Sequence, residues 1–100
     1  MIFAILLMDR PGTAELRVKV RPVHRDYLAL QANRMAFSGP LTTDDGKTAV
    51  GSLLVMDFST RAEAEAWLKE EPFTKAGVYE DPVIHVFHNM WTQKTGFPPA

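Results

Sequence analysis

The residues from 2 to 8, Ile-Phe-Ala-Ile-Leu-Leu-Met, form an uninterrupted apolar run that ends at Asp9 and a nearby Pro-Gly pair. A short run bounded by turn residues is typical of a strand that is covered on both faces. The run has no basic leading segment and no small-residue cleavage pattern, so we do not interpret it as a targeting segment. No stretch of the chain approaches the roughly 18 apolar residues that cross a bilayer, and we expect no membrane partner.

Two helical regions are predicted from the spacing of apolar residues and from end signals. Residues 13–33 have a helical pattern, with a break or restart predicted at Arg21-Pro22, because proline suits the first turn of a helix. Thr60 and Glu63 fit a capping box at the start of a second helix, with Glu63 placed to reach back to the Thr60 amide. Pro72 ends that helix, and a further short turn or helix is predicted at 73–77, closed by glycine.

Three more strands are predicted, at residues 35–41, 50–58 and 83–88, and the first two are joined by an Asp-Asp-Gly-Lys turn. Together with the first strand and the two helices, they give the order β-α-β-β-α-β. This order predicts an α+β domain with the ferredoxin-like arrangement, in which both helices lie on one face of an antiparallel sheet. We place the domain at residues 1–90 and expect an irregular tail at 91–100.

The predicted sheet has more apolar surface than two helices can cover. Residues of the first strand are apolar on both faces, and the strand at 50–58 repeats this with Leu53 and Val55 on one face and Leu54 and Met56 on the other. An exposed apolar patch of this kind in a small domain usually marks an interface. We therefore predict a homodimer that packs sheet against sheet.

Composition and charge exclude several classes of function. The net charge is -1, and a protein that neutralises several phosphates needs a clustered surplus of Lys and Arg, so we expect no nucleic-acid partner. There is no cysteine, which fits a cytoplasmic location and excludes thiolate chemistry. His85 and His88 are three residues apart on a predicted strand and therefore point to opposite faces. We expect neither a metal site nor a cofactor.

His24 is the residue most suggestive of chemistry. On a helical projection it lies in the same arc as the apolar residues Val20, Val23, Tyr27, Leu28 and Leu30, whereas Arg21, Arg25, Asp26 and Asn33 fall outside that arc. One interpretation is a core histidine held by a single hydrogen bond. The other is a general acid or base, because imidazole exchanges protons at neutral pH.

Asp9 is a possible partner for His24. It closes the first strand on the same face as Phe3, Ile5 and Leu7, where a carboxylate could hydrogen-bond the His24 ring and fix its tautomer. Its alternative role is an Asx cap of the turn that follows the strand. The spacing of the two residues leaves both roles open.

Three short motifs, taken in this order, resemble the YCII-related family over residues 1–90. The motifs are Arg21-Pro22-Val23-His24, then Ser38-Gly39-Pro40-Leu41, then Glu71-Pro72-Phe73-Thr74-Lys75-Ala76-Gly77. The resemblance implies a ferredoxin-like domain of the dimeric α+β barrel superfamily. It also implies an active site around His24 and Asp9, with Ser38 and Gly39 lining the same cleft. Family members usually have Asp before the Pro-Phe pair, whereas this chain has Glu71, so the role of that carboxylate is left open.

These observations lead to one main hypothesis and two alternatives. The main one is a cofactor-free enzyme that transfers protons on a small organic anion, in an isomerisation or an elimination, with His24 as general acid/base and Asp9 orienting it. Arg21 is a candidate for attracting a substrate carboxylate, and Phe73 is either a ligand contact or a plug that closes the second helix. Alternatively, the cleft belongs to a non-catalytic module that binds a small ligand, or, by fold analogy alone, to a cofactor-independent oxygenase.

Overall fold

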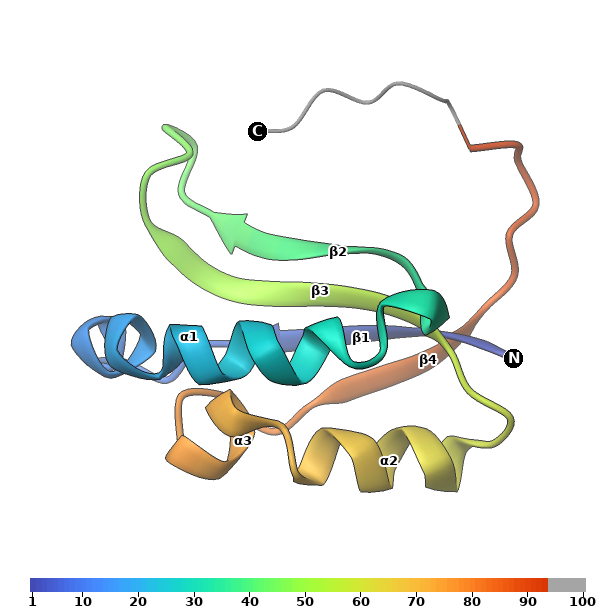
Figure 1. The fold of residues 1–100 in the computed structure, drawn as a ribbon. Helices are drawn as coiled ribbons and strands as arrows, with labels where there is room; N and C mark the ends of the chain where they lie inside the picture. Colours follow the sequence, from blue (N-terminus) through green and yellow to red (C-terminus); the bar gives the residue numbers. More distant parts are fainter. Residues whose placement is uncertain (94–100) are drawn as a thin grey trace.

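Strand β1 (Ile2–Met8) lies inside a four-stranded antiparallel sheet whose strand order is β2-β3-β1-β4 (Figure 1). The computed structural model describes residues 1–93. Along the chain, the other elements are α1 (Ala14–Ala29), a 3-10 turn (Ala32–Arg34), β2 (Met35–Thr42), β3 (Ala49–Asp57), α2 (Arg61–Lys69), α3 (Pro72–Ala76) and β4 (Val83–Phe87). The predicted α+β ferredoxin-like fold is confirmed, with the short α3 inserted after α2. The remainder of the predicted tail, residues 94–100, lies outside the described residues.

The core forms on the face of the sheet that the helices cover. Phe3, Ile5 and Leu7 are almost completely buried, and they alternate with partly exposed residues, as the two-residue period of a strand requires. The register places them opposite Met56, Leu54 and Ser52 of β3. Buried side chains of α2, α3 and the segment after α3 complete this cluster: Ala64, Leu68, Phe73, Val78 and Tyr79.

Helix α1 is continuous, so the predicted break at Arg21-Pro22 is wrong. Pro22 lies inside the helix and, lacking an N–H group, leaves the carbonyl of Val18 without its usual helical partner. The Val18 side chain is 73% exposed, and water has access to this surface of the helix. A solvent-facing turn therefore tolerates the missing hydrogen bond that a buried turn would not.

The ends of α2 and α3 follow the predicted signals with one difference. The Thr60 hydroxyl accepts the Glu63 amide at 3.1 Å, as in a capping box. The Glu63 carboxylate accepts a hydrogen bond from the Ser59 amide at 3.2 Å, one residue before the predicted Thr60 amide. Helix α3 ends at Gly77, whose φ of 84° is the left-handed conformation that glycine adopts at helix ends.

The second face of the sheet carries exposed apolar side chains and is not covered by α1, α2 or α3, which lie together on the other side (Figure 1). Partly buried residues of the central strands, including Leu6 and Leu53, pair on this face. Around them lie side chains that are about two-fifths or more exposed: Met8, Phe37, Val83 and Phe87. Within residues 1–93, no helix is both long and apolar enough to cross a membrane.

Candidate functional site

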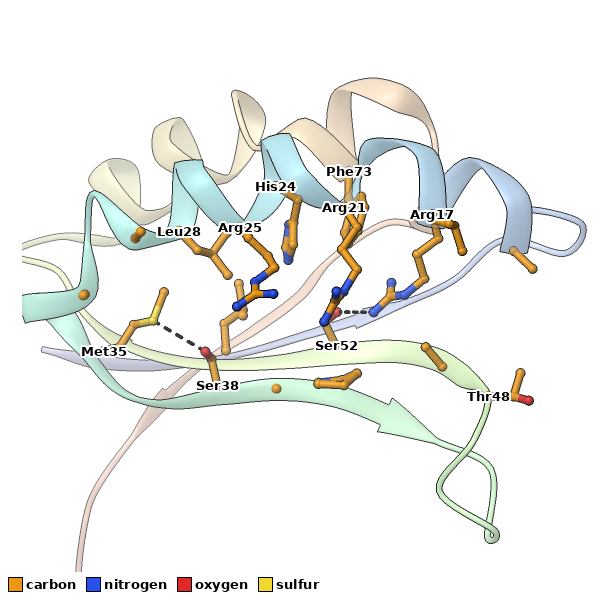
Figure 2. A pocket seen from close by; sticks show the side chains of 18 of the residues that line it. Arg17, Arg21, His24, Arg25, Leu28, Met35, Ser38, Thr48, Ser52 and Phe73 are labelled. Atoms are coloured by element: carbon orange, nitrogen blue, oxygen red, sulfur yellow. Dashed lines mark hydrogen bonds between the residues drawn. The ribbon is translucent and has the colours of Figure 1, made fainter. Parts of the chain in front are cut away.

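A cleft of about 680 Å³ separates α1 from the strands β2 and β3 (Figure 2). No residue of α1 is fully buried, and the helix packs more closely on α3 than on the sheet below it. The wall on the helix side includes Arg21, His24 and Leu28, while Ser38, Gly39 and Leu54 form the strand side. Helix α1 thus borders the cleft along one side, while its partly buried Leu16, Val20 and Leu28 pack against the core.

His24 reaches into this cleft from α1, and its side chain is 12% exposed. Its Nδ1 atom hydrogen-bonds Oε1 of Glu71, and its ring stacks on Phe73 with the ring centroids 3.9 Å apart and the planes 14° from parallel. Because a carboxylate only accepts, Nδ1 carries the proton of that hydrogen bond. The lone pair of Nε2 then remains for a ligand in the cleft.

Glu71 is completely buried and has two structural partners, one for each carboxylate oxygen. Oε1 binds His24, and Oε2 accepts the backbone amide of Thr74 at 3.1 Å, which makes Glu71 the N-cap of α3. Pro72 follows at the first helical position, where its fixed φ favours the turn. The cap therefore orients the carboxylate that orients His24.

Asp9 lies apart from His24, and the predicted hydrogen bond between them is wrong. The Asp9 carboxylate accepts from Arg17 at 3.1 Å, in an ion pair whose side chains are only 11% and 12% exposed. Arg17 is long enough to reach the end of β1 from the first half of α1, and it occupies the position that we had assigned to the imidazole. Burial raises the pKa of Asp9, and the charge of Arg17 opposes that shift.

Arg17 also connects the helix to the sheet through Ser52. Its second terminal nitrogen donates to the Ser52 hydroxyl at 3.1 Å and to the Gly51 carbonyl at 3.2 Å, and the guanidinium lies over the Phe73 ring. Ser52 is in turn 2.8 Å from the Tyr79 hydroxyl. Burial raises the pKa of Tyr79 to about 12. These contacts form a rigid polar floor beneath His24 and Phe73.

The cleft is basic. Arg17, Arg21, Arg25 and Lys47 line it, and no aspartate or glutamate lines it among the residues that the structure describes. Arg21 and Arg25 were placed outside the apolar arc by the helical projection, whereas Val23 and Leu30, which the projection placed inside it, are 60% and 76% exposed. Val20 and Leu28 of the predicted arc do pack against the core, but α1 also borders an open cleft, which the projection did not show.

The other predicted ligand contacts lie around the same cleft. Ser38 and Gly39 come from β2, and the Ser38 hydroxyl is 3.5 Å from the Met35 sulfur. Phe73 is 1% exposed and therefore fills the end of the helical layer. One face of its ring stacks on His24. The structure thus brings together His24, Arg21, Ser38, Gly39 and Phe73, while Asp9 borders a smaller neighbouring pocket.

Metal ligation has no evident place in the part of the chain that the structure describes. No group of three His, Asp or Glu side chains among residues 1–93 is arranged to hold an ion. His85 pairs across from Ala4 of β1 and is exposed, and His88 lies beyond the end of β4.

The sequence contained a signal for the partner of His24 that our interpretation did not use. A Glu immediately before Pro72 at the start of a predicted helix occupies the N-cap position, which fixes the direction of its carboxylate. The distance of 47 residues between His24 and Glu71 gives no such indication, because it depends on how α1 and α3 pack. Arg25 and Ser52 carried no signal of their own.

Comparison with known proteins agrees with this architecture. The model of the YCII-related domain matches residues 1–88. Protein YciI of Escherichia coli is 30% identical over 98 residues, covering 91% of this chain and all of the relative, and a Haemophilus influenzae protein is 32% identical over the same length and coverage.

A solved structure is also similar. It is the 5-chloro-2-hydroxyhydroquinone dehydrochlorinase TftG from Burkholderia phenoliruptrix, in complex with 2,5-dihydroxybenzoquinone. It has a TM-score of 0.82 and 30% identity, covering 88% of this chain and 94% of that one. With a family model that spans most of its length and relatives that match end to end, this chain belongs to the YCII-related domain family.

Proposed function

We propose that the protein is an enzyme without a cofactor that transfers protons on a small organic anion, with His24 as the general acid/base. The observation that carries this proposal is the fixed state of the ring: Nδ1 is bonded to a fully buried carboxylate, and the ring lines an open cleft. A histidine that merely filled the core would have apolar neighbours on the side away from its hydrogen bond. The cleft that His24 lines contains arginines and serines as well as apolar side chains.

The geometry assigns a step to each group. A proton of the substrate passes to Nε2, and the positive charge that develops on the ring is stabilised by Glu71 across the Nδ1 hydrogen bond. The Phe73 ring keeps the imidazole in its plane by stacking. Return of the proton at another atom completes an isomerisation, whereas departure of a leaving group completes an elimination.

The similarity to TftG favours elimination. That protein is named a dehydrochlorinase, and its structure holds 2,5-dihydroxybenzoquinone. Loss of hydrogen chloride needs a base to accept a proton, which is the role proposed for His24, and a ring-shaped ligand is compatible with a cleft of about 680 Å³. In this proposal Asp9 is a positioning residue, because its carboxylate binds Arg17 and helps to hold the guanidinium on Ser52.

The proposed assembly is a homodimer. The face of the sheet away from the helices exposes Phe37, Val83 and Phe87 around partly buried Leu6 and Leu53. Burying such a surface against a second copy removes its apolar area from water and agrees with the two-sided apolar pattern of β1.

The test is turnover by His24→Ala. A panel of hydroxylated and chlorinated quinols and small organic acids is incubated with the protein in D2O, and product formation, chloride release and deuterium uptake are followed by NMR. We expect wild-type protein to convert at least one compound, and His24→Ala to lose turnover by about 100-fold or more. The control is His88→Ala, which changes an exposed histidine beyond β4 and retains turnover.

The outcomes separate catalysis from binding or packing. If a compound binds the wild-type protein without exchange or conversion, the cleft belongs to a binding module and the enzyme proposal is wrong. Circular dichroism and urea unfolding of His24→Ala give the second readout. A variant that unfolds instead of losing only turnover shows that the histidine serves the core.

A further inference from the structure

Within residues 1–93, two arginines beside His24 have no ion-pair partner. Arg21 and Arg25 are one helical turn apart on α1, and their guanidinium groups extend into the cleft toward the strands (Figure 2). Within residues 1–93, neither has an ion-pair or hydrogen-bond partner, whereas Arg17 on the same side of the helix is bound to Asp9, Gly51 and Ser52. Arg17 is thus structural, and the other two remain available.

The remaining lining of the cleft is apolar at one end. Leu28 and Met35 face each other across it beyond Arg25, at the end away from Arg17 (Figure 2). Leu54, which pairs with Ser38 across β2 and β3, also lines the cleft, and Phe73 stacks on His24. The cleft therefore has a cationic part and an apolar part, and His24 lies between them.

Two neighbouring cations without a counter-charge repel each other, and an anion bound between them removes that repulsion. A guanidinium has a planar fork of donors that matches the two oxygens of a carboxylate, and a charge-assisted pair of this kind is stronger than a neutral hydrogen bond. Both arginines are solvent-exposed in the free protein, so a ligand reaches them without opening the fold.

We propose that the cleft recognises an amphipathic organic acid, whose ionised group binds Arg21 and Arg25 and whose hydrocarbon body packs against Leu28, Met35 and Leu54. This inference deepens the proposed function and rests on it for the reaction, because the atom next to the acid group then lies beside His24. The C–H bond at that atom breaks, the proton passes to Nε2, and the electron pair is delocalised toward the acid group. The guanidinium groups stabilise the negative charge that accumulates there.

The test uses three probes and calorimetry. Benzoate has both a carboxylate and an apolar ring, benzamide keeps the ring and shape without the charge, and acetate keeps the charge without the ring. We expect benzoate to bind at least about tenfold more tightly than either of the others, because each lacks one of the two contacts. Absence of benzoate binding at about 10 mM, or equal binding of benzamide, would overturn the proposal.

Charge-matched variants separate recognition from a general electrostatic effect. Arg21→Gln and Arg25→Gln each weaken benzoate binding by roughly tenfold, since each removes one charged hydrogen-bond donor. Lys19→Gln removes the same charge from the same helix at an exposed position outside the cleft lining, and it leaves the affinity within about twofold. If Lys19→Gln weakens binding as much as the arginine variants do, the arginines form no site.

Failure of this inference is distinct from failure of the proposed function. His24→Ala retains the preference for benzoate over benzamide while it loses turnover, because the acid group contacts the arginines and not the imidazole. A variant that retains turnover overturns the role of His24 but leaves the recognition of acids intact. Equal binding of benzoate and benzamide overturns the recognition of acids whatever the turnover.

Discussion

At the residue scale, the site depends on Glu71, because one buried carboxylate binds two residues, His24 and Thr74. Oε1 binds Nδ1 of His24, and Oε2 accepts the Thr74 amide that begins α3. The Thr74 hydroxyl adds a longer contact to Oε2 at 3.4 Å, so both oxygens of this residue are paired. A buried carboxylate with a single partner would be costly to maintain.

Glu71→Gln tests this double role. An amide has only one oxygen, so glutamine accepts the Thr74 amide or the His24 proton but not both. We expect turnover to fall by about 100-fold and the free energy of unfolding to fall by about 1–2 kcal/mol, the typical cost of losing a helix cap. Turnover and urea denaturation measure the two effects.

The neighbouring residue gives the matched control for that substitution. Glu70→Gln makes the same chemical change one position earlier, where the carboxylate is 64% exposed and forms an ion pair with Lys75. An exposed ion pair contributes little, so both readouts stay near those of the wild type. If the two variants behave alike, Glu71 does not orient His24.

At the element scale, the order and type of the secondary structure could be predicted, because each depends on local sequence. The alternation in β1, the cap at Thr60 and the glycine at 77 act over a few residues, and the structure contains all three. The cleft between α1 and the sheet could not be predicted. It depends on tertiary contacts, because α1 packs against α3 and Arg17 binds Ser52 and the Gly51 carbonyl of β3.

This difference explains the errors in the site. A helical projection gives the direction of each side chain relative to its helix but not the distance from the helix to the sheet. The projection correctly placed Arg21 toward water but did not show that it also borders a cleft, and Asp9 appeared to face His24. With a cleft below α1, the arginine lines the cavity, and Asp9 is occupied by Arg17.

The segment between α3 and β4 is anchored by Tyr79, whose hydroxyl is bonded to Ser52 of β3. Burial raises the pKa of Tyr79 from 10.0 to about 12, because the phenolate is poorly solvated there. The folded state thus favours the protonated form, so the stability it confers is fully present below pH 10 and is lost as the pH rises from 10 to 12. The loss amounts to roughly 2–3 kcal/mol.

Unfolding in urea at a series of alkaline pH values, with phenolate absorbance as a second signal, measures this loss. Tyr79→Phe has no ionisable hydroxyl, and its stability therefore falls less steeply over the same interval. The variant also shows whether Ser52 and Arg17 keep their contact without the phenol. An equally steep fall in the variant would assign the pH dependence to another group.

At the scale of the whole molecule, the sheet has one face under the helices and one face open. The proposed homodimer covers the open face, and Phe37, which is 45% exposed on β2, lies on it beside Val55. Phe37→Lys places a charge in that interface, where it has to be desolvated. We expect the dissociation constant to rise by about tenfold or more.

Sedimentation velocity over a concentration series measures that constant. Leu30→Lys is the control, because Leu30 is 76% exposed at the end of α1, away from the open face. A wild-type protein that sediments as a monomer at about micromolar concentration contradicts the dimer. If the two lysine variants dissociate equally, the dimer does not form through the open face of the sheet.

The shared carboxylate of Glu71 has one more consequence, because it links two equilibria that are usually independent. Fraying of α3 releases the Thr74 amide from Oε2 and frees the carboxylate to turn, which also loosens its hold on His24. Reciprocity then requires that a ligand which draws a proton onto the imidazole also slows the local opening of α3. The Thr74 amide binds Glu71 and not the ligand, yet its hydrogen-exchange rate should therefore change when a ligand protonates His24.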